Sequence, residues 1–340
     1  MCSSDLQPLF TELSDILLIE ARRLRGDPRQ AALRNVQDIL EQAKSAELQD
    51  YFQNECVLPE TSVELDQVEQ GTATVYPIIL DDRVEMLVSI GGYIHQFTSR
   101  VERAELVAIV NDFRDNLQVA RGDDEYLEIA EELHDLLLAP FSDLLAENDV
   151  KTLLFVPDGA LRTISISAFH DGDQYLTERY AIATTPGLNL ILPKPLELRQ
   201  ATVFAGGISE AVQGFSSLPG VPGELTNLRS KYGAAVLQDD NFRLDVVTDQ
   251  MANDDYSIVH IATHGHFDSN PEKSFLLAYD DKLTLNLLER SIGVRKLLGE
   301  PLELLVLSTC ETAAGDNRAV GRWQCDDRDT ESDHTSMTWS

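Results

Sequence analysis

Two residues in the second half of the chain, His264 and Cys310, have the side-chain chemistry of a nucleophilic catalytic pair. A thiol is a poor nucleophile until it ionises, and a neighbouring imidazolium lowers its pKa and later supplies a proton to the leaving group. Each residue follows a short run rich in Ile, Val and Leu, within YSIVHIATHGHFDSN (256–270) and LELLVLSTCETAAG (302–315). Such runs are typical of buried parallel strands, whose carboxyl ends bind ligands. We therefore expect both side chains at one rim of a parallel sheet.

The order and spacing of the two residues support this chemistry. Cys310 follows His264 by 46 residues, and in caspase-type proteases the histidine precedes the cysteine by about 50 residues. The backbone N–H groups of Gly265 and Cys310 are the expected oxyanion donors, because glycine leaves its amide unobstructed. The alternative is that Cys310 is a small buried apolar residue and His264 a hydrogen-bonded turn residue.

A cluster of histidines on the same predicted strand permits a different chemistry. On an extended strand, His260, His264 and His266 share one side, and together with Asp268 they offer donors that bind zinc. No other cluster in the sequence has the spacing that would complete the ligand set. His260 also lies among apolar residues, where a hydrogen-bonded core histidine is an ordinary interpretation. A zinc-dependent hydrolase therefore remains an alternative to cysteine chemistry, which needs no cofactor.

Further polar residues near predicted strand ends are candidates for a substrate pocket. Asp158 follows the apolar run 152–156 and could contact a basic side chain of a substrate. An aspartate before a glycine is also a common turn residue, which is the competing interpretation. His266 and Asp268 complete the set of possible pocket residues.

Composition limits the classes of function. The 340 residues are 43% hydrophobic and carry a formal net charge of −31, which can support a sizeable core but repels nucleic acids and anionic membrane surfaces. The N-terminal sequence lacks the pattern of a signal peptide, and no stretch approaches 18 consecutive apolar residues. Four scattered cysteines do not form a disulfide framework. These features predict a cytoplasmic protein.

The apolar pattern divides the chain into regions of different character. Residues 1–58 have apolar side chains at spacings of three and four, which predicts a helical segment. Residues 59–318 are expected to form one domain, with an N-terminal part (59–149) and a part in which strands alternate with helices (150–318). This alternation predicts an α/β fold with a mostly parallel sheet flanked by helices. Residues 319–340 lack apolar periodicity and are predicted to be a disordered tail.

Individual elements follow from the same periodicity. The first two helices are separated at residues 25–28, with Asp27 as N-cap and Pro28 as the first helical residue. Before the two strands of the dyad, strands are expected at 72–80, 84–90, 94–101, 152–156, 164–169, 180–184, 201–205 and 235–237. Helices are expected at 105–120, 126–146 with a kink at Pro140, 224–232, 244–251 and 283–293.

Several blocks of the sequence resemble the CHAT family of caspase-like domains, which in bacteria are often attached to tetratricopeptide repeats. These blocks are LLFVPDGALRTISISAF (153–169), LPGVPGELTNL (218–228), VHIATHGHFD (259–268), SFLLAYDDKLTLNLL (274–288) and LLVLSTCETAAGDNRA (304–319). The resemblance implies a caspase-like sheet and a protein or peptide substrate. It also implies that His264 and Cys310 are the catalytic dyad of a clan CD cysteine peptidase. The stretch AELQDYFQNECV (46–57) is similar to the segment that joins repeats to this domain, which implies a regulatory partner at the N-terminal helices.

The resemblance ends near Ala319. Family members continue with a glycine- and alanine-rich helix and a further strand, and residues 319–340 match neither. We therefore expect a chain truncated at both ends relative to the family, with a C-terminal tail from an altered reading frame. A second function follows from this expectation, namely a catalytically inactive CHAT protein that keeps the dyad residues and serves as a protein-interaction module.

Overall fold

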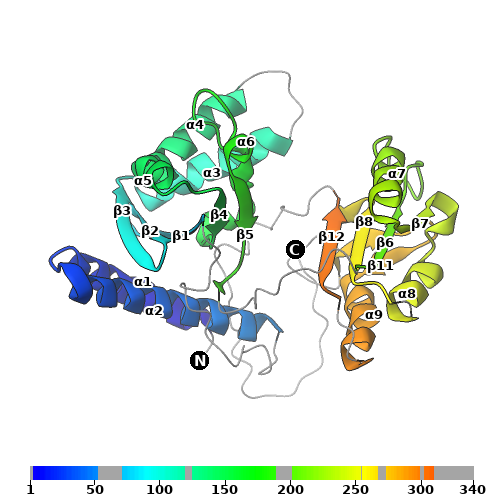
Figure 1. The fold of residues 1–340 in the computed structure, drawn as a ribbon, viewed down its shortest axis with the longest axis horizontal. Coiled ribbons are helices and arrows are strands. Elements are labelled where there is room, and N and C mark those ends of the chain that lie inside the picture. Colours follow the sequence, from blue (N-terminus) through cyan, green and yellow to red (C-terminus); the bar gives the residue numbers. More distant parts are fainter. Residues whose placement is uncertain are drawn as a thin grey trace, which may run out of the picture.

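The computed structural model describes residues 3–52, 71–118, 125–188, 201–253, 255–266, 273–298 and 302–309. Their elements form two groups, one around a five-stranded sheet and the other around a four-stranded sheet (Figure 1). Within these ranges, every helix is too short or too polar to cross a membrane.

The five-stranded sheet has the order β3-β2-β1-β4-β5. Its first three strands are an antiparallel meander of β1 (Thr72–Ile79), β2 (Val84–Ile90) and β3 (Tyr93–Ser99). The short strands β4 (Thr152–Phe155) and β5 (Ala181–Thr184) continue the sheet parallel to β1. The predicted strands are confirmed here, although this sheet is mixed rather than mostly parallel.

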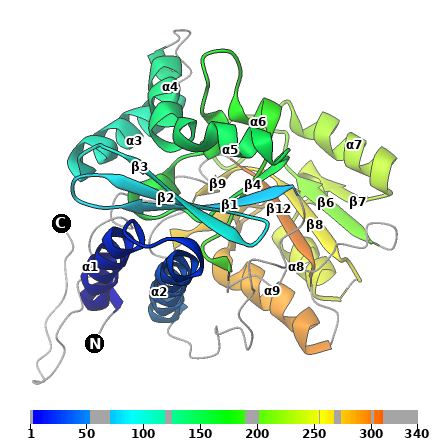
Figure 2. The same ribbon diagram turned by 60° about the vertical axis from the view of Figure 1, so that its left-hand side comes forward.

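Helices cover both faces of this sheet (Figure 2). The hairpin of α1 (Ser3–Ala21) and α2 (Gly26–Phe52) lies on one face. On the other face are α3 (Arg103–Gln118), α4 (Glu125–Leu137), α5 (Ser142–Glu147) and, near β5, the short α6 (Leu176–Arg179). Side chains of β1 alternate between two cores, and burial on both sides explains its nearly continuous apolar sequence.

Buried polar groups attach the helical hairpin to the sheet. The Tyr76 hydroxyl on β1 donates a hydrogen bond of 2.8 Å to Oε1 of Glu41 on α2, which also accepts one from the amide of Leu188. Nζ of Lys44 donates to the carbonyl of Pro157 at 3.0 Å, and burial lowers the pKa of this lysine. Because unpaired buried polar groups are costly, these bonds make α2 an integral part of the structure.

Two predictions for the region after α3 have different outcomes. The expected break at Pro140 is confirmed, since a 3₁₀ turn at Ala139–Phe141 separates α4 from α5. The expected strand at 164–169 is wrong, because Ile166–Ala168 forms a 3₁₀ turn. Ile164, Ile166 and Phe169 are buried in the core without a partner strand. Alternating Ile and Ser residues imitated the period of a strand.

The four-stranded sheet has the order β12-β8-β6-β7, and all its strands are parallel. The strands are β6 (Val203–Gly207), β7 (Ala235–Gln238), β8 (Ile258–Ala262) and β12 (Leu304–Ser308). α7 (Val221–Tyr232) packs on one face, and α8 (Leu244–Asn253) and α9 (Leu285–Leu298) pack on the other. The predicted alternation of parallel strands and helices is confirmed.

The strand order has a functional consequence. The chain runs from β6 outward to β7 and then returns to place β8 on the opposite side of β6. The carboxyl ends of β6 and β8 therefore form a topological switch point, where open α/β sheets bind their ligands. A small antiparallel sheet that the sequence did not predict begins there, with β9 (Gly265–His266), β10 (Phe275–Leu277) and β11 (Lys282–Thr284).

Gly207 permits the close approach of β6 to β8 at this switch point. A Cβ atom at Gly207 would lie 2.2 Å from the carbonyl oxygen of Ala262 and 3.0 Å from a Val221 methyl group. The next amide, of Ile208, donates a hydrogen bond of 3.1 Å to that same carbonyl. The glycine is therefore required by the packing of two strands and α7.

We expect Gly207→Ala to lower the free energy of unfolding by about 1–3 kcal/mol, because the added methyl group overpacks this junction. Chemical denaturation monitored by circular dichroism measures the change. Gly223→Ala on α7 is the matched control, since its Cβ would meet nothing within 4 Å and alanine favours a helix. Equal stability of the two variants would contradict the prediction.

Candidate active site

His264 lies two residues beyond the end of β8, at the switch point. Its side chain is half-buried. The neighbouring strand β12 pairs with β8 in parallel, with Ser308 opposite Ala262, and the amide of Thr263 extends this ladder by donating to the Ser308 carbonyl at 3.2 Å. Cys310 lies outside the described residues. In the sequence it stands two positions after Ser308, the same offset that separates His264 from Ala262.

The imidazole of His264 is oriented by the loop that follows β6. Its Nε2 atom lies 2.7 Å from the carbonyl oxygen of Ser216, and the Phe215 ring packs against it with centroids 5.1 Å apart. A carbonyl only accepts hydrogen bonds, so Nε2 carries the proton and, in the neutral ring, Nδ1 carries the lone pair. This histidine therefore presents Nδ1 as its base.

A carboxylate holds the loop that contains Ser216. Asp239, at a backbone φ of 51°, accepts hydrogen bonds from the amides of Ser209 at 2.6 Å and Glu210 at 3.2 Å. It also accepts from the Ser209 hydroxyl and from the side chain of Gln238. Partial burial raises the pKa of Asp239, but these hydrogen bonds outweigh burial and hold it below its ordinary value.

Gly265 begins β9 and is buried. The amide of Leu277 donates to the carbonyl of His264 at 2.8 Å, so these two residues form a hydrogen-bonded pair of the β9–β10 ladder. Hydrogen-bonded and non-hydrogen-bonded pairs alternate in antiparallel sheets. The next pair, Gly265 and Leu276, therefore leaves the amide of Gly265 pointing away from β10.

The histidines of the predicted zinc cluster have other partners. Nε2 of His260 lies 2.8 Å from Oε1 of Glu224 on α7. His264 binds Ser216, and the exposed His266 packs against Phe275 with ring centroids 5.8 Å apart. Asp268 lies outside the described residues, and within these residues no three His, Cys, Asp or Glu side chains are arranged to hold a metal ion.

Asp158 is placed in the other half of the structure. It follows β4 of the five-stranded sheet, whereas His264 follows β8 of the four-stranded sheet. Its carboxylate lies 3.2 Å from a guanidinium nitrogen of Arg162 and 4.0 Å from Nζ of Lys44. These contacts assign it to the junction between α2 and the first sheet.

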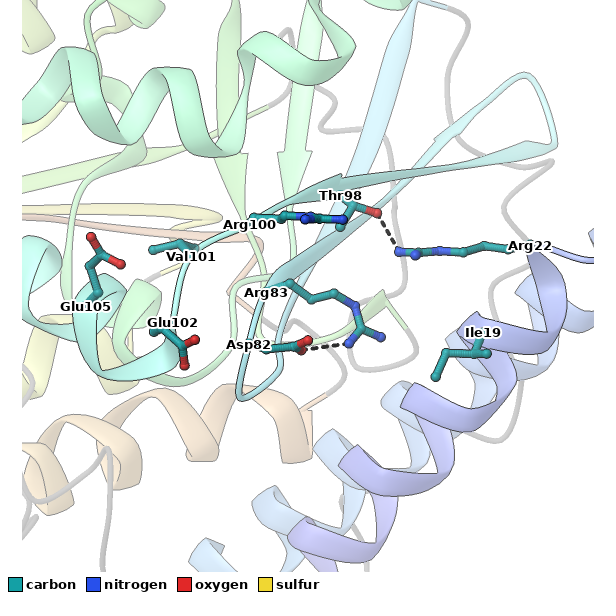
Figure 3. A pocket seen from close by; sticks show the side chains of 9 residues that line it. All are labelled: Ile19, Arg22, Asp82, Arg83, Thr98, Arg100, Val101, Glu102 and Glu105. Atoms are coloured by element: carbon teal, nitrogen blue, oxygen red, sulfur yellow. Dashed lines mark hydrogen bonds and ion pairs between the residues drawn. The ribbon is translucent and has the colours of Figure 1, made fainter.

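A cavity of about 650 Å³ also lies in this half, between the end of α1, the β1–β2 turn, the end of β3 and the start of α3 (Figure 3). Arg22 and Arg83 line it, and both contact the fully buried carboxylate of Glu85. Arg83 also pairs with Asp15 on α1 and with Asp82. Because carboxylates pair with both of these guanidinium groups, we interpret the cluster as ionic contacts that attach α1 to β2 and the β1–β2 turn.

Four residues of the site were not predicted from the sequence, namely Asp239, Ser216, Phe215 and Glu224. The carbonyl of Ser216 and the ring of Phe215 lie in a loop, where no periodicity marks their contact with His264. Glu224 stands within the LPGVPGELTNL block and at the start of the predicted helix 224–232, and neither feature indicates a role in the site. A charged residue among the apolar positions of a helix is the signal that could have identified it.

The parallel sheet flanked by helices, with a histidine at its switch point, is consistent with a caspase-like α/β fold. A family model of the CHAT domain matches residues 127–323, more than half of the chain. The chain therefore belongs to the CHAT-domain family, which is caspase-like and related to peptidases. No curated protein significantly matches the chain.

We expect Asp239→Asn to destabilise the protein by about 1–2 kcal/mol at pH 7, because neutral Asn accepts weaker hydrogen bonds than a carboxylate. Asn tolerates the left-handed backbone, so the change isolates the charge. The folded-state pKa is depressed, so the stabilisation is present above the unfolded pKa of about 3.9 and is lost as the pH falls through the folded value.

Denaturation curves of both proteins between pH 3 and 7 measure this difference. The exposed neighbour Asp240, changed to Asn, is the control and should alter stability by less than about 0.5 kcal/mol. A pH-independent difference between wild type and Asp239→Asn would contradict the assignment.

Proposed function

We propose that this protein is a cysteine endopeptidase that uses His264 and Cys310 as its dyad. The observation that carries the proposal is the register of β12 on β8, which aligns Ser308 with Ala262. Side chains that follow adjacent parallel strands at equal offsets belong to the same rim of a sheet. The engaged Nε2 atom of His264 supports the proposal, because it leaves Nδ1 to serve as the base.

The reaction follows cysteine peptidase chemistry. Nδ1 of His264 takes the thiol proton of Cys310, and the thiolate sulfur bonds to the scissile carbonyl carbon. The resulting oxyanion is stabilised by backbone N–H groups, for which Gly265 and Cys310 are our candidates. The C–N bond then breaks, and the imidazolium protonates the leaving amine. A water molecule deprotonated by His264 hydrolyses the thioester and regenerates the free thiol.

The proposal includes a protein or peptide substrate and a cytoplasmic location, where thiols remain reduced. His266 is exposed next to the dyad histidine and is a candidate for substrate contact, together with Asp268. Asp158, which follows β4 of the five-stranded sheet and pairs with Arg162 and Lys44, is the third candidate pocket residue.

A second candidate function is that of an inactive protein-interaction module, and the surface of α1 favours it. Four large apolar side chains lie exposed at helical spacing on this helix, namely Leu9, Leu13, Ile16 and Ile19. An apolar stripe of this kind is typical of a surface that binds another helix. The same stripe is our candidate contact for a regulatory partner if the protein is an enzyme.

We expect wild-type protein to generate new N-termini in a proteome-derived peptide library, and Cys310→Ala to abolish them. His264→Ala should reduce the rate at least about 1,000-fold, because the thiolate then lacks its partner and the leaving amine its acid. Mass spectrometry of the library measures both effects. Identical peptide profiles for wild type and Cys310→Ala, at matched folding by circular dichroism, would favour the interaction module.

A further inference from the structure

Glu224 occupies an unusual position on α7. Val221, Leu225 and Leu228 face the sheet and are buried or partly buried there, and Glu224 lies on the same stripe at helical spacing. A carboxylate in this position needs a polar partner. Its partner, His260, is an equally unusual residue at the centre of the apolar strand β8.

The two carboxylate oxygens of Glu224 reach two different strands. Oε1 lies 2.8 Å from Nε2 of His260 on β8, and Oε2 accepts a hydrogen bond of 3.3 Å from the hydroxyl of Ser308 on β12. The imidazole is only 11% exposed and the carboxylate 35% exposed. One side chain of a helix therefore connects the two strands that precede His264 and Cys310.

Leu305 and Leu307 of β12 pack against the core on the other face of the sheet, whereas this connection lies on the more exposed α7 face. In the described part of the sheet, β12 is an outer strand that pairs on one side with β8. On the α7 side of the sheet, Leu304 at the start of β12 is 40% exposed, and Ser308 at its end is exposed. Among the described residues, the hydrogen bond between Ser308 and Glu224 joins β12 to α7, two residues before Cys310.

We propose that Glu224 is a positioning residue that holds the carboxyl end of β12 against β8, and so sets the distance between the Cys310 thiol and the His264 imidazole. The inference rests on the proposed function of these two residues. His260 takes part by fixing one oxygen of the carboxylate, and the other oxygen then faces Ser308. Glu224 itself acts through the strands and need not touch the substrate.

The rate of Cys310 alkylation by iodoacetamide tests this inference on the full chain. Peptide-level mass spectrometry between pH 5 and 9.5 gives the apparent pKa of the thiol and compares it with Cys2, Cys56 and Cys325 in the same molecules. In wild type we expect Cys310 to react fastest near neutral pH, because its thiolate is stabilised by the imidazolium. In Glu224→Gln we expect the pKa of Cys310 to rise by about one unit, which lowers its rate at pH 6.5 about tenfold.

Two further variants separate positioning from stability. Ser308→Ala removes only the bond to β12, and the double variant Glu224→Gln/Ser308→Ala should react no more slowly than Glu224→Gln alone, because both changes break one connection. In Glu224→Leu/His260→Leu, apolar side chains replace the pair. This variant should fold and yet show the raised Cys310 pKa. The control is Glu289→Gln on the exposed side of α9, which should leave the profile unchanged.

The outcomes are distinguishable. A wild-type Cys310 that reacts no faster than the other three thiols would overturn the proposed dyad. A fast wild-type Cys310 with the same pH profile in Glu224→Gln and Glu224→Leu/His260→Leu would leave the dyad intact and overturn the role of Glu224. A raised Cys310 pKa in both variants, at unfolding midpoints matching Glu289→Gln, would support it.

Discussion

The parallel pairing of β8 with β12 is the constraint on which the candidate site depends. Adjacent parallel strands that end at paired residues bring the residues that follow them to one edge of the sheet. Ser308 and Ala262, the last residues of β12 and β8, are paired in this way. The close approach of β6, which only Gly207 allows, keeps β8 and α7 in place around this edge. Geometry at the rim is thus a consequence of backbone packing inside the sheet.

Polar groups at the rim convert this packing into a defined orientation of side chains. Asp239 gathers the backbone of the loop after β6, and the loop places the Ser216 carbonyl against His264. On the α7 side of the sheet, Glu224 links His260 and Ser308. Each carboxylate is satisfied by several donors, which is the condition under which partly buried charges are tolerated. The carboxylates of Asp239 and Glu224 therefore position parts of the backbone, in addition to contributing to the negative net charge of the chain.

The first half of the structure uses similar physics for a different purpose. Buried Glu41 and Lys44 on α2, and Glu85 between Arg22 and Arg83, attach the helical hairpin to the five-stranded sheet. The hairpin nevertheless leaves the apolar stripe of α1 exposed. This exposed stripe is the surface that we proposed as the contact for a partner.

The amino-acid sequence by itself determined most elements and provided the hypothesis for the chemistry of the site. Continuous apolar runs indicated β8 and β12, and the His264 and Cys310 that follow them indicated cysteine chemistry, because strand periodicity and thiol reactivity are local properties. The false strand at 164–169 shows the limit of this logic, since its alternating pattern had no partner strand. Only the tertiary structure decided that Ser216 orients His264 and that Glu224 reaches Ser308, 84 residues away. It also placed Asp158 after a strand of the five-stranded sheet, beside Arg162. Contacts between residues so distant in sequence depend on strand order and register, which no short-range pattern encodes.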